Sequence, residues 1–231
     1  MPQHKAGPVV AFIPPSCAGA GYFRPLRRVL GERVDFRAVE LPGHGRRYRE
    51  DPLTVARDAA RDVADRLGGP VDAIYGESLG AYVGLAVTAL LDQPRPPLLL
   101  AAANSPPSVR ERIRTEDADS IESAVAMLAA MGGQIPTAVV DDPELARQAF
   151  PLMRADLHLS QSFIERTREL RVAGDIHVLG GTADTALCRL ESWADHTTGH
   201  CSVNRLPGGH LLSATNPTGV AEVVLRSLDD R

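Results

Sequence analysis

The sequence predicts an α/β fold in which a mostly parallel central sheet is covered by helices on both faces. Short apolar runs alternate along the chain with longer segments of helical periodicity. Several of these runs are uninterrupted by polar residues, which is typical of strands that are buried on both faces of a parallel sheet. With 231 residues, the chain is long enough to build one such domain around a sizeable core.

Four strands are expected in the first half of the chain, and those at 9–13 and 98–103 are expected to be buried. Each is a short, largely apolar run, and the four runs lie at 9–13, 34–42, 72–76 and 98–103. Three helices are expected between them, at 23–31, 55–67 and 81–91. Gly31 is expected to stop the first helix, and Thr54 is expected to cap the second.

The pattern changes between about Ser105 and Leu170, where no run resembles a strand. Two helical stretches occur in this segment, at 120–131 and 143–167. We interpret residues 105–170 as a helical insertion that caps the sheet, with further core helices as the alternative. After it, strands are expected at 175–181 and 202–209, and helices near 190–197 and at 217–228. We see no linker or internal repeat, so residues 1–231 are expected to form a single domain.

Composition argues against several classes of protein. The formal net charge of −4 is unlike that of a general nucleic-acid-binding protein, whose binding face would be basic. No apolar run reaches the roughly 18 residues that a membrane span needs, and the N-terminal segment lacks the features of a secretory signal. The three cysteines share no metal-ligand spacing, which fits a reducing compartment. We therefore expect a cytoplasmic protein that binds neither nucleic acid nor membrane.

Ser78 lies in the sequence YGESLG, where a predicted strand ends and a predicted helix begins. A strand-turn-helix elbow presents a serine hydroxyl above the sheet, and its sharp turn requires small neighbours, here Gly76, Gly80 and Ala81. The helix N-terminus also stabilises negative charge that develops beside the serine. Ser78 is therefore the candidate nucleophile, with an ordinary turn serine as the alternative.

A serine nucleophile needs a histidine base and a carboxylate that orients the imidazole. His210 follows the last predicted strand in LPGGH, where the chain order serine, acid, histidine places the base. His44 also follows a strand but precedes the serine, whereas His196 and His200 are expected at the surface. Asp184 is the acid in the loop after the penultimate predicted strand, although it would also suit a turn or a helix cap.

Two backbone N–H groups are expected to bind the oxyanion that forms during acyl transfer. One belongs to Leu79, directly after the nucleophile, and the other to Ser16 or Cys17 in the loop after the first strand. No base is expected beside the Cys17 thiol, so we assign this cysteine a structural role. Glu77 would place a negative charge near the oxyanion, and we assign it no role.

Taken in order along the chain, these motifs resemble the stand-alone type II thioesterases of polyketide and nonribosomal peptide pathways, which have the α/β-hydrolase fold. The similarity runs from about Val9 to Leu212 and includes FIPPSCAGAGYFRPL, VELPGHGRR, YGESLGAYVG, MGGQIP, LGGTAD and LPGGH. The resemblance implies the catalytic triad Ser78, Asp184 and His210. The chain departs from the family pattern where it has Ser16-Cys17-Ala18 for Ala-Gly-Gly, Glu77 for histidine and Thr185 for proline.

The resemblance also implies a substrate and a partner. Members of the family hydrolyse acyl groups from the phosphopantetheine arm of acyl carrier proteins, and no motif here indicates a metal or an organic cofactor. An apolar acyl pocket under the cap is expected to include residues that would equally serve as packing, namely Met127, Leu128, Met131, Leu152 and Met153. Five arginines are candidate contacts for an acidic carrier protein, or else a solvated face: Arg46, Arg47, Arg110, Arg112 and Arg114.

Three other functions remain open on the sequence alone. A carboxylesterase acting on small diffusible esters would use the same triad, as would a product-releasing or cyclising acyl transferase with an internal nucleophile. A catalytically silent protein that only binds carrier domains would keep the fold. Preference for carrier-bound thioesters and acylation of Ser78 discriminate among these functions.

Overall fold

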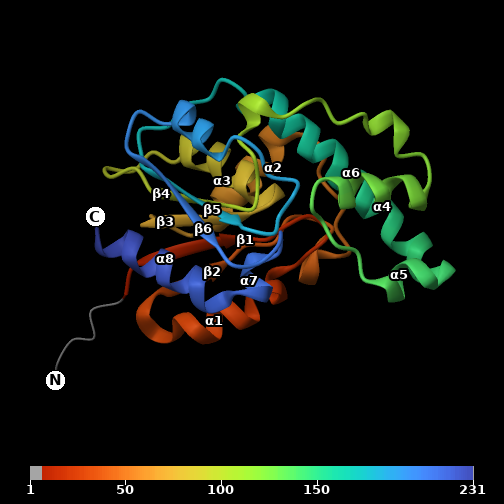
Figure 1. Cartoon of the computed structure of the whole chain (residues 1–231), viewed down its shortest axis with the longest axis horizontal. Coiled ribbons are helices and arrows are strands. Elements are labelled where there is room, and N and C mark those ends of the chain that lie inside the picture. Colours follow the sequence, from red (N-terminus) through yellow and green to blue (C-terminus); the bar gives the residue numbers. More distant parts are fainter. Residues whose placement is uncertain (1–6, 231) are drawn as a thin grey trace.

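The computed structural model describes residues 7–230, which form a six-stranded sheet with helices on both faces (Figure 1). In spatial order the strands are β2 (Asp35–Ala38), β1 (Val9–Ile13), β3 (Ala73–Glu77), β4 (Leu98–Ala102), β5 (Ile176–Gly181) and β6 (Cys201–Leu206). Every neighbouring pair of strands is parallel. The predicted α/β class with a parallel sheet is therefore confirmed.

Helices and short turns occupy the connections between the strands. The α-helices are α1 (Arg24–Leu30), α2 (Ala56–Arg66), α3 (Leu79–Leu90), α4 (Ile121–Ala130), α5 (Thr137–Asp141), α6 (Pro143–Thr167), α7 (Leu212–Thr215) and α8 (Pro217–Asp229). Turns of 3₁₀ helix lie at Ala20–Phe23, Gly31–Arg33, Gly45–Arg47, Pro107–Val109, Thr115–Asp117 and Leu190–His196. Among the helices of residues 7–230, none is long and apolar enough to cross a bilayer.

The core forms because the inner strands bury side chains on both faces of the sheet. Ala11 and Ile13 of β1 join the apolar cluster that contains α2 and α3, whereas Val10 and Phe12 join the cluster that contains α1 and α8. This alternation is the two-residue period of a strand. Figure 1 shows α1 and α8 on one side of the sheet and α2 and α3 on the other. Burial on both faces explains why the inner strands β1 and β4 are apolar without interruption, whereas the edge strands β2 and β6 contain polar and charged residues.

The segment between β4 and β5 contains helices and turns but no strand in the described structure. The C-terminal half of α6 belongs to the main core, where Phe163 and Ile164 pack in the same cluster as α3. Its N-terminal half packs against α4 in a separate small cluster that includes Leu128, Met153 and Leu157. Figure 1 shows α4 and α5 together at one end of the molecule. The segment is thus part of the core at one end and a separate layer at the other.

Thr54 does not cap α2, so this prediction is wrong. The helix begins at Ala56, its N-cap residue is Val55, and no side chain of the N-cap accepts a hydrogen bond. The Ala56 N–H donates instead to Ser162 Oγ on α6, at 2.9 Å. A side chain that is distant in sequence therefore takes the place of the local cap.

His196 is buried, and the prediction that it lies at the surface is also wrong. Its Nδ1 lies 2.9 Å from the Leu170 carbonyl oxygen and its Nε2 lies 3.1 Å from Ser108 Oγ. Its ring packs 5.6 Å from the ring of Trp193. The expected helix at this point is a 3₁₀ turn, which folds Trp193 and His196 against the core.

Candidate active site

Ser78 lies in the sharp turn between β3 and α3. Its backbone has φ +55° and ψ −119°, a strained conformation for a residue with a side chain. A Cβ at Gly76 would overlap the Gly80 carbonyl oxygen, and a Cβ at Gly80 would overlap the Ile13 carbonyl oxygen. The two glycines are therefore required for the chain to pass so close to itself, and they leave Ser78 at the tip of the turn.

Three side chains that are far apart in sequence form a chain of hydrogen bonds at this turn. Ser78 Oγ lies 2.9 Å from His210 Nε2, and His210 Nδ1 lies 2.7 Å from Asp184 Oδ2. The Ala186 N–H donates to the other carboxylate oxygen of Asp184 at 3.0 Å and so orients it. Because the carboxylate accepts the Nδ1 proton, Nε2 is left to accept the proton of the Ser78 hydroxyl.

The loops that follow β5 and β6 bring Asp184 and His210 to the carboxyl end of β3. The side chains of both residues are almost fully buried, with exposed fractions of 2% and 3%. Burial strengthens the hydrogen bond between them, because little water competes for it. The arrangement can therefore activate a serine hydroxyl as a nucleophile.

His44, the alternative base, lies in a different hydrogen-bonding network. Its Nε2 lies 3.0 Å from Asp156 Oδ2 on α6, and its Nδ1 lies 2.9 Å from the Pro42 carbonyl oxygen. Burial lowers the pKa of His44, but the hydrogen bond and charge of Asp156 outweigh it, so the pKa is raised overall. Both ring nitrogens are occupied, so His44 holds the turn after β2 against α6.

Asp156 also limits which N–H groups can bind the oxyanion, because its Oδ2 accepts the Cys17 N–H at 2.7 Å. Because the Cys17 N–H already donates to a carboxylate, it is not free to bind the oxyanion, and this part of the prediction is corrected. Ser16 and Leu79 both line a cavity that contains Ser78, so their N–H groups remain the candidates. Burial and the nearby Asp156 charge raise the pKa of the Cys17 thiol, which keeps it protonated and unreactive.

Glu77 has a role that sequence reasoning missed. Its carboxylate is fully buried and accepts hydrogen bonds from the hydroxyls of Tyr22 at 2.7 Å and Tyr75 at 2.9 Å. The Ser213 hydroxyl also donates to it, together with the Ser213 N–H at 3.3 Å. Burial raises the pKa of Glu77, although these donors oppose the shift. The side chain points away from the oxyanion site and into the protein.

The Glu77 network joins three segments that surround Ser78. Tyr22 follows the loop that contains Ser16, Glu77 directly precedes Ser78, and Ser213 lies three residues after His210. The hydrogen bonds of one carboxylate therefore hold the oxyanion loop, the nucleophile and the histidine loop at fixed distances. The only signal in the sequence is the unusual glutamate before the serine.

Two cavities open beside Ser78. The larger, of about 460 Å³, extends past Leu79 and Tyr82 to Met127 and Ile164. The smaller, of about 210 Å³, is lined by the loop after β1, by His210 and by residues 133–136. Both cavities contain Ser16, Ser78 and Met131 in their walls.

The predicted pocket residues divide between these cavities and the interior. Met127 lines the larger cavity, Leu128 lines the smaller one and Met131 lines both. Met153 lies instead in the apolar cluster between α4 and α6, and Leu152 contacts the turn at 43. For these two residues the prediction is corrected, because the N-terminal half of α6 packs against α4 and lines neither cavity, whereas Ser160 and Ile164, further along the helix, line the larger one.

The five arginines that were predicted to contact a carrier protein lie on two different surfaces. Arg110, Arg112 and Arg114 lie beside the larger cavity. Arg112 is paired with Glu116 at 2.7 Å, and Arg114 is paired with Asp117 at 3.1 Å. Arg46 and Arg47 lie on a different surface, after β2.

Comparisons with known proteins agree with this architecture. A family model described as "Thioesterase domain" matches residues 8–228. The medium-chain S-acyl fatty acid synthase thioesterase of Rattus norvegicus is 24% identical over 226 residues, which cover 92% of this chain and 85% of that protein. Among solved structures, ClbQ from the colibactin pathway has a TM-score of 0.84 at 20% identity, covering 97% of this chain and 98% of ClbQ.

A second solved structure is the type II thioesterase BorB from the borrelidin biosynthetic cluster. It has a TM-score of 0.77 at 25% identity, and the match covers 99% of this chain and 95% of BorB. The family model spans nearly the whole chain, including the serine turn and the loops after β5 and β6. The protein therefore belongs to the thioesterase domain family and has its α/β-hydrolase fold.

Proposed function

We propose that the protein hydrolyses acyl thioesters held on the phosphopantetheine arm of acyl carrier proteins, through an acyl-enzyme on Ser78. The observation that supports this most directly is the buried hydrogen-bond chain from Ser78 through His210 to Asp184, placed between two cavities. The likeness to BorB, a type II thioesterase from a biosynthetic cluster, favours a carrier-bound substrate.

In the first half of the reaction, Ser78 Oγ attacks the thioester carbonyl carbon while His210 Nε2 takes its proton. The N–H groups of Leu79 and Ser16 stabilise the oxyanion of the tetrahedral intermediate. When this intermediate collapses, the carbon–sulfur bond breaks and Nε2 returns the proton to the leaving pantetheine sulfur. The acyl group remains as an ester on Ser78.

In the second half, water attacks the ester carbonyl and His210 Nε2 takes a proton from it. The second tetrahedral intermediate releases the free acid, and Nε2 returns the proton to Ser78 Oγ. Asp184 stabilises the imidazolium in both halves through its hydrogen bond to Nδ1. These steps use side chains, backbone N–H groups and water, and the phosphopantetheine belongs to the substrate.

The two cavities separate the parts of the substrate. We assign the acyl chain to the larger cavity, where Met127, Met131 and Ile164 offer an adaptable apolar wall. The smaller cavity, on the side of the loop after β1, then receives the pantetheine arm. The three cysteines are free thiols, which supports the cytoplasm as the compartment.

A panel of acyl carrier proteins loaded with acetyl to dodecanoyl groups tests the proposal. Wild type is expected to release acids from the carrier faster than from the same acyl groups on small free thioesters. Ser78→Ala should abolish hydrolysis, while Ser192→Ala, which lies outside both cavities, should retain it.

The other functions would give different results in the same experiments. Cleavage of small esters without any activity on carriers would indicate a carboxylesterase. Release of cyclic or transferred products in place of free acids would indicate an acyl transferase. If folded wild type is not labelled at Ser78 by a fluorophosphonate probe, the protein is a catalytically silent binder.

A further inference from the structure

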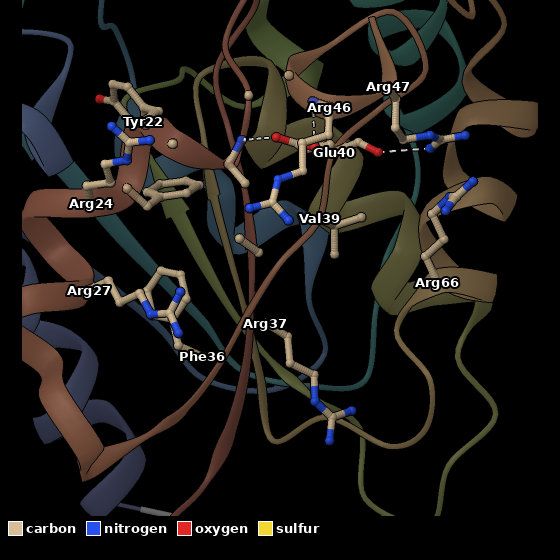
Figure 2. A pocket seen from close by; sticks show the side chains of 16 residues that line it. Tyr22, Arg24, Arg27, Phe36, Arg37, Val39, Glu40, Arg46, Arg47 and Arg66 are labelled. Atoms are coloured by element: carbon tan, nitrogen blue, oxygen red, sulfur yellow. Dashed lines mark hydrogen bonds between the residues drawn. The ribbon is translucent and has the colours of Figure 1, made fainter. Parts of the chain in front are cut away.

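A groove of about 860 Å³ lies along the edge strand β2, and no step of the proposed reaction uses it (Figure 2). Its walls are the turn at 19–24, the end of β2 at 36–40 and the turn at 45–47, with Arg27 and Arg66 at its sides. This volume is in the range of sites that hold small ligands.

The groove is strongly basic although the chain as a whole has a net charge of −4. Its lining contains one carboxylate, Glu40, and six arginines: Arg24, Arg27, Arg37, Arg46, Arg47 and Arg66. Figure 2 shows Arg24 and Arg27 on one side, Arg46 near the middle and Arg47 with Arg66 on the other side. A concave surface with this charge concentrates anions.

Three of the six guanidinium groups are neutralised by nearby carboxylates. Arg37 pairs with Asp35 at 3.1 Å, and Arg47 and Arg66 both pair with Asp62. The other three, which make no ion pair with any carboxylate of residues 7–230, are Arg24, Arg27 and Arg46. Arg27 lies over the Phe36 ring, 5.7 Å from its centroid, which holds its guanidinium at the groove wall.

Glu40 fixes the shape of the groove. Its Oε1 accepts the Ala20 N–H at 2.8 Å and its Oε2 accepts the Arg46 N–H at 3.0 Å (Figure 2). A Cβ at Gly45 would overlap its carboxylate. The two turns that form the walls are thus joined by one side chain, and the hydrogen bonds satisfy its charge. The free guanidinium groups are therefore held on a defined surface.

The groove is separated from the Ser78 site by a single loop. Residues 15–18 line the smaller cavity beside Ser78, and residues 19–24 line the groove. Tyr22 lines both, and its hydroxyl donates to Glu77, the residue before Ser78. A long flexible substrate that leaves the smaller cavity over this loop would meet the groove.

We propose that the groove binds the phosphate of the phosphopantetheine arm while the thioester lies at Ser78. This inference rests on the proposed function. A guanidinium group donates two parallel hydrogen bonds to phosphate oxygens, which makes arginine the preferred partner for this anion. The arginines beside the larger cavity are less suited, because Arg112 and Arg114 have carboxylate partners and Arg110 donates to Asn104.

Calorimetry compares the affinity of the protein for 4′-phosphopantetheine with its affinity for pantetheine. The two compounds differ only in the phosphate, so the difference in affinity measures the contribution of the phosphate. Wild type should bind the phosphorylated compound about tenfold or more tightly, the effect of a charge-assisted hydrogen-bonded pair. The double variant Arg24→Gln/Arg46→Gln, which we call the groove variant, should lose this preference. The matched control is Arg28→Gln/Arg61→Gln, a pair of exposed arginines outside the groove, and it should keep the preference. Loss of the preference in Arg112→Gln/Arg114→Gln, but not in the groove variant, would overturn the proposal.

Kinetics separate this inference from the proposed function. In the groove variant, KM should rise about tenfold for acyl-phosphopantetheine, acyl-coenzyme A and the acyl carrier protein, and stay unchanged for acyl-pantetheine. An increase confined to the carrier protein would mean that the groove recognises the protein surface, and would refute the phosphate site. If wild type hydrolyses no thioester but retains the phosphate preference in calorimetry, the proposed function is refuted and the phosphate site is supported. If wild type hydrolyses acyl-pantetheine and acyl-phosphopantetheine with the same KM, the phosphate site is refuted and the proposed function is supported.

Discussion

Replacing Glu77 with alanine tests whether this carboxylate holds the loops around Ser78 in place. Tyr75 and Ser213, two of its hydrogen-bond donors, are fully buried. Without the carboxylate, the Tyr75 and Ser213 hydroxyls can still bond each other, because they lie 2.9 Å apart, but one of these two hydroxyls and the buried Ser213 N–H lose their acceptor. Each buried donor without an acceptor costs about 1–3 kcal/mol, so the free energy of unfolding should fall by about 2–6 kcal/mol. Removal of a buried carboxylate offsets part of this loss, because its desolvation opposes folding. We expect a net loss of about 2–4 kcal/mol in urea unfolding.

The effect on reactivity follows from the positions of the three linked segments. Without the carboxylate, the loops that contain Ser16 and His210 are no longer fixed to the turn at Ser78. A displacement of about 1 Å between reacting groups lowers a rate by about 100-fold, so acylation of Ser78 in Glu77→Ala should slow by about 10–100-fold. The assay is the rate of fluorophosphonate labelling, measured on the folded fraction. Glu77→Gln, which keeps one oxygen acceptor and the side-chain shape, should stay within about threefold of wild type.

The same variant pair tests the ionisation of Glu77. Because burial raises its pKa, the folded state binds the Glu77 proton more tightly than the unfolded state does. The contribution of this group to stability therefore falls as pH rises from its unfolded pKa to its raised folded pKa. Glu77→Gln lacks this titration, so its stability relative to wild type should rise with pH over that interval. Labelling of folded Glu77→Ala at the wild-type rate would refute the positional reasoning, and parallel pH profiles of wild type and Glu77→Gln would refute the argument on ionisation.

Three further predictions concern the site and its surroundings. Asp184→Asn should lower kcat on acyl thioesters by about 10³–10⁴-fold, because the amide cannot hold the His210 tautomer that accepts the serine proton. Gly132→Ala should lower kcat by about 10–100-fold, because a Cβ at this residue of φ +92° would overlap the His210 ring. Iodoacetamide should alkylate exposed Cys188 well before Cys17, whose thiol pKa is raised by burial, as peptide mass spectrometry would report.

Each of these predictions has a control or a result that would contradict it. Full activity in Asp184→Asn would mean that another group orients the imidazole. For Gly132, the comparison is Gly68→Ala, which has a similar positive φ of +68° but open space around the added Cβ. It should cost about 1 kcal/mol of stability from backbone strain and leave kcat unchanged. Equal alkylation rates at Cys17 and Cys188 in the folded protein would contradict the burial argument.

The sequence by itself determined the parts of this protein that depend on local patterns. Apolar runs alternating with helical segments predict the parallel sheet, because burial on both faces leaves no place for polar residues in inner strands. The small residues around Ser78 predict the elbow, because only glycine fits where the backbone passes so close to itself. Parallel strands bring their carboxyl ends to one edge, so residues after separate strands, such as Asp184 and His210, were expected to meet there.

Only the tertiary structure decided which partner each buried polar group takes. Asp156 lies in the middle of a helix, and nothing in its neighbourhood along the chain shows that it accepts the Cys17 N–H and orients His44. The role of Glu77 does not follow from the sequence, because two of its donors, Tyr22 and Ser213, come from distant segments. The arginine groove combines residues of α1, α2, β2 and two turns, and the nearby carboxylates Asp35 and Asp62 pair with three of its six arginines. The other three arginines keep free charges because no carboxylate of residues 7–230 pairs with them. Hydrogen bonds and ion pairs of this kind depend on atomic positions in space, which periodicity and motif spacing do not specify.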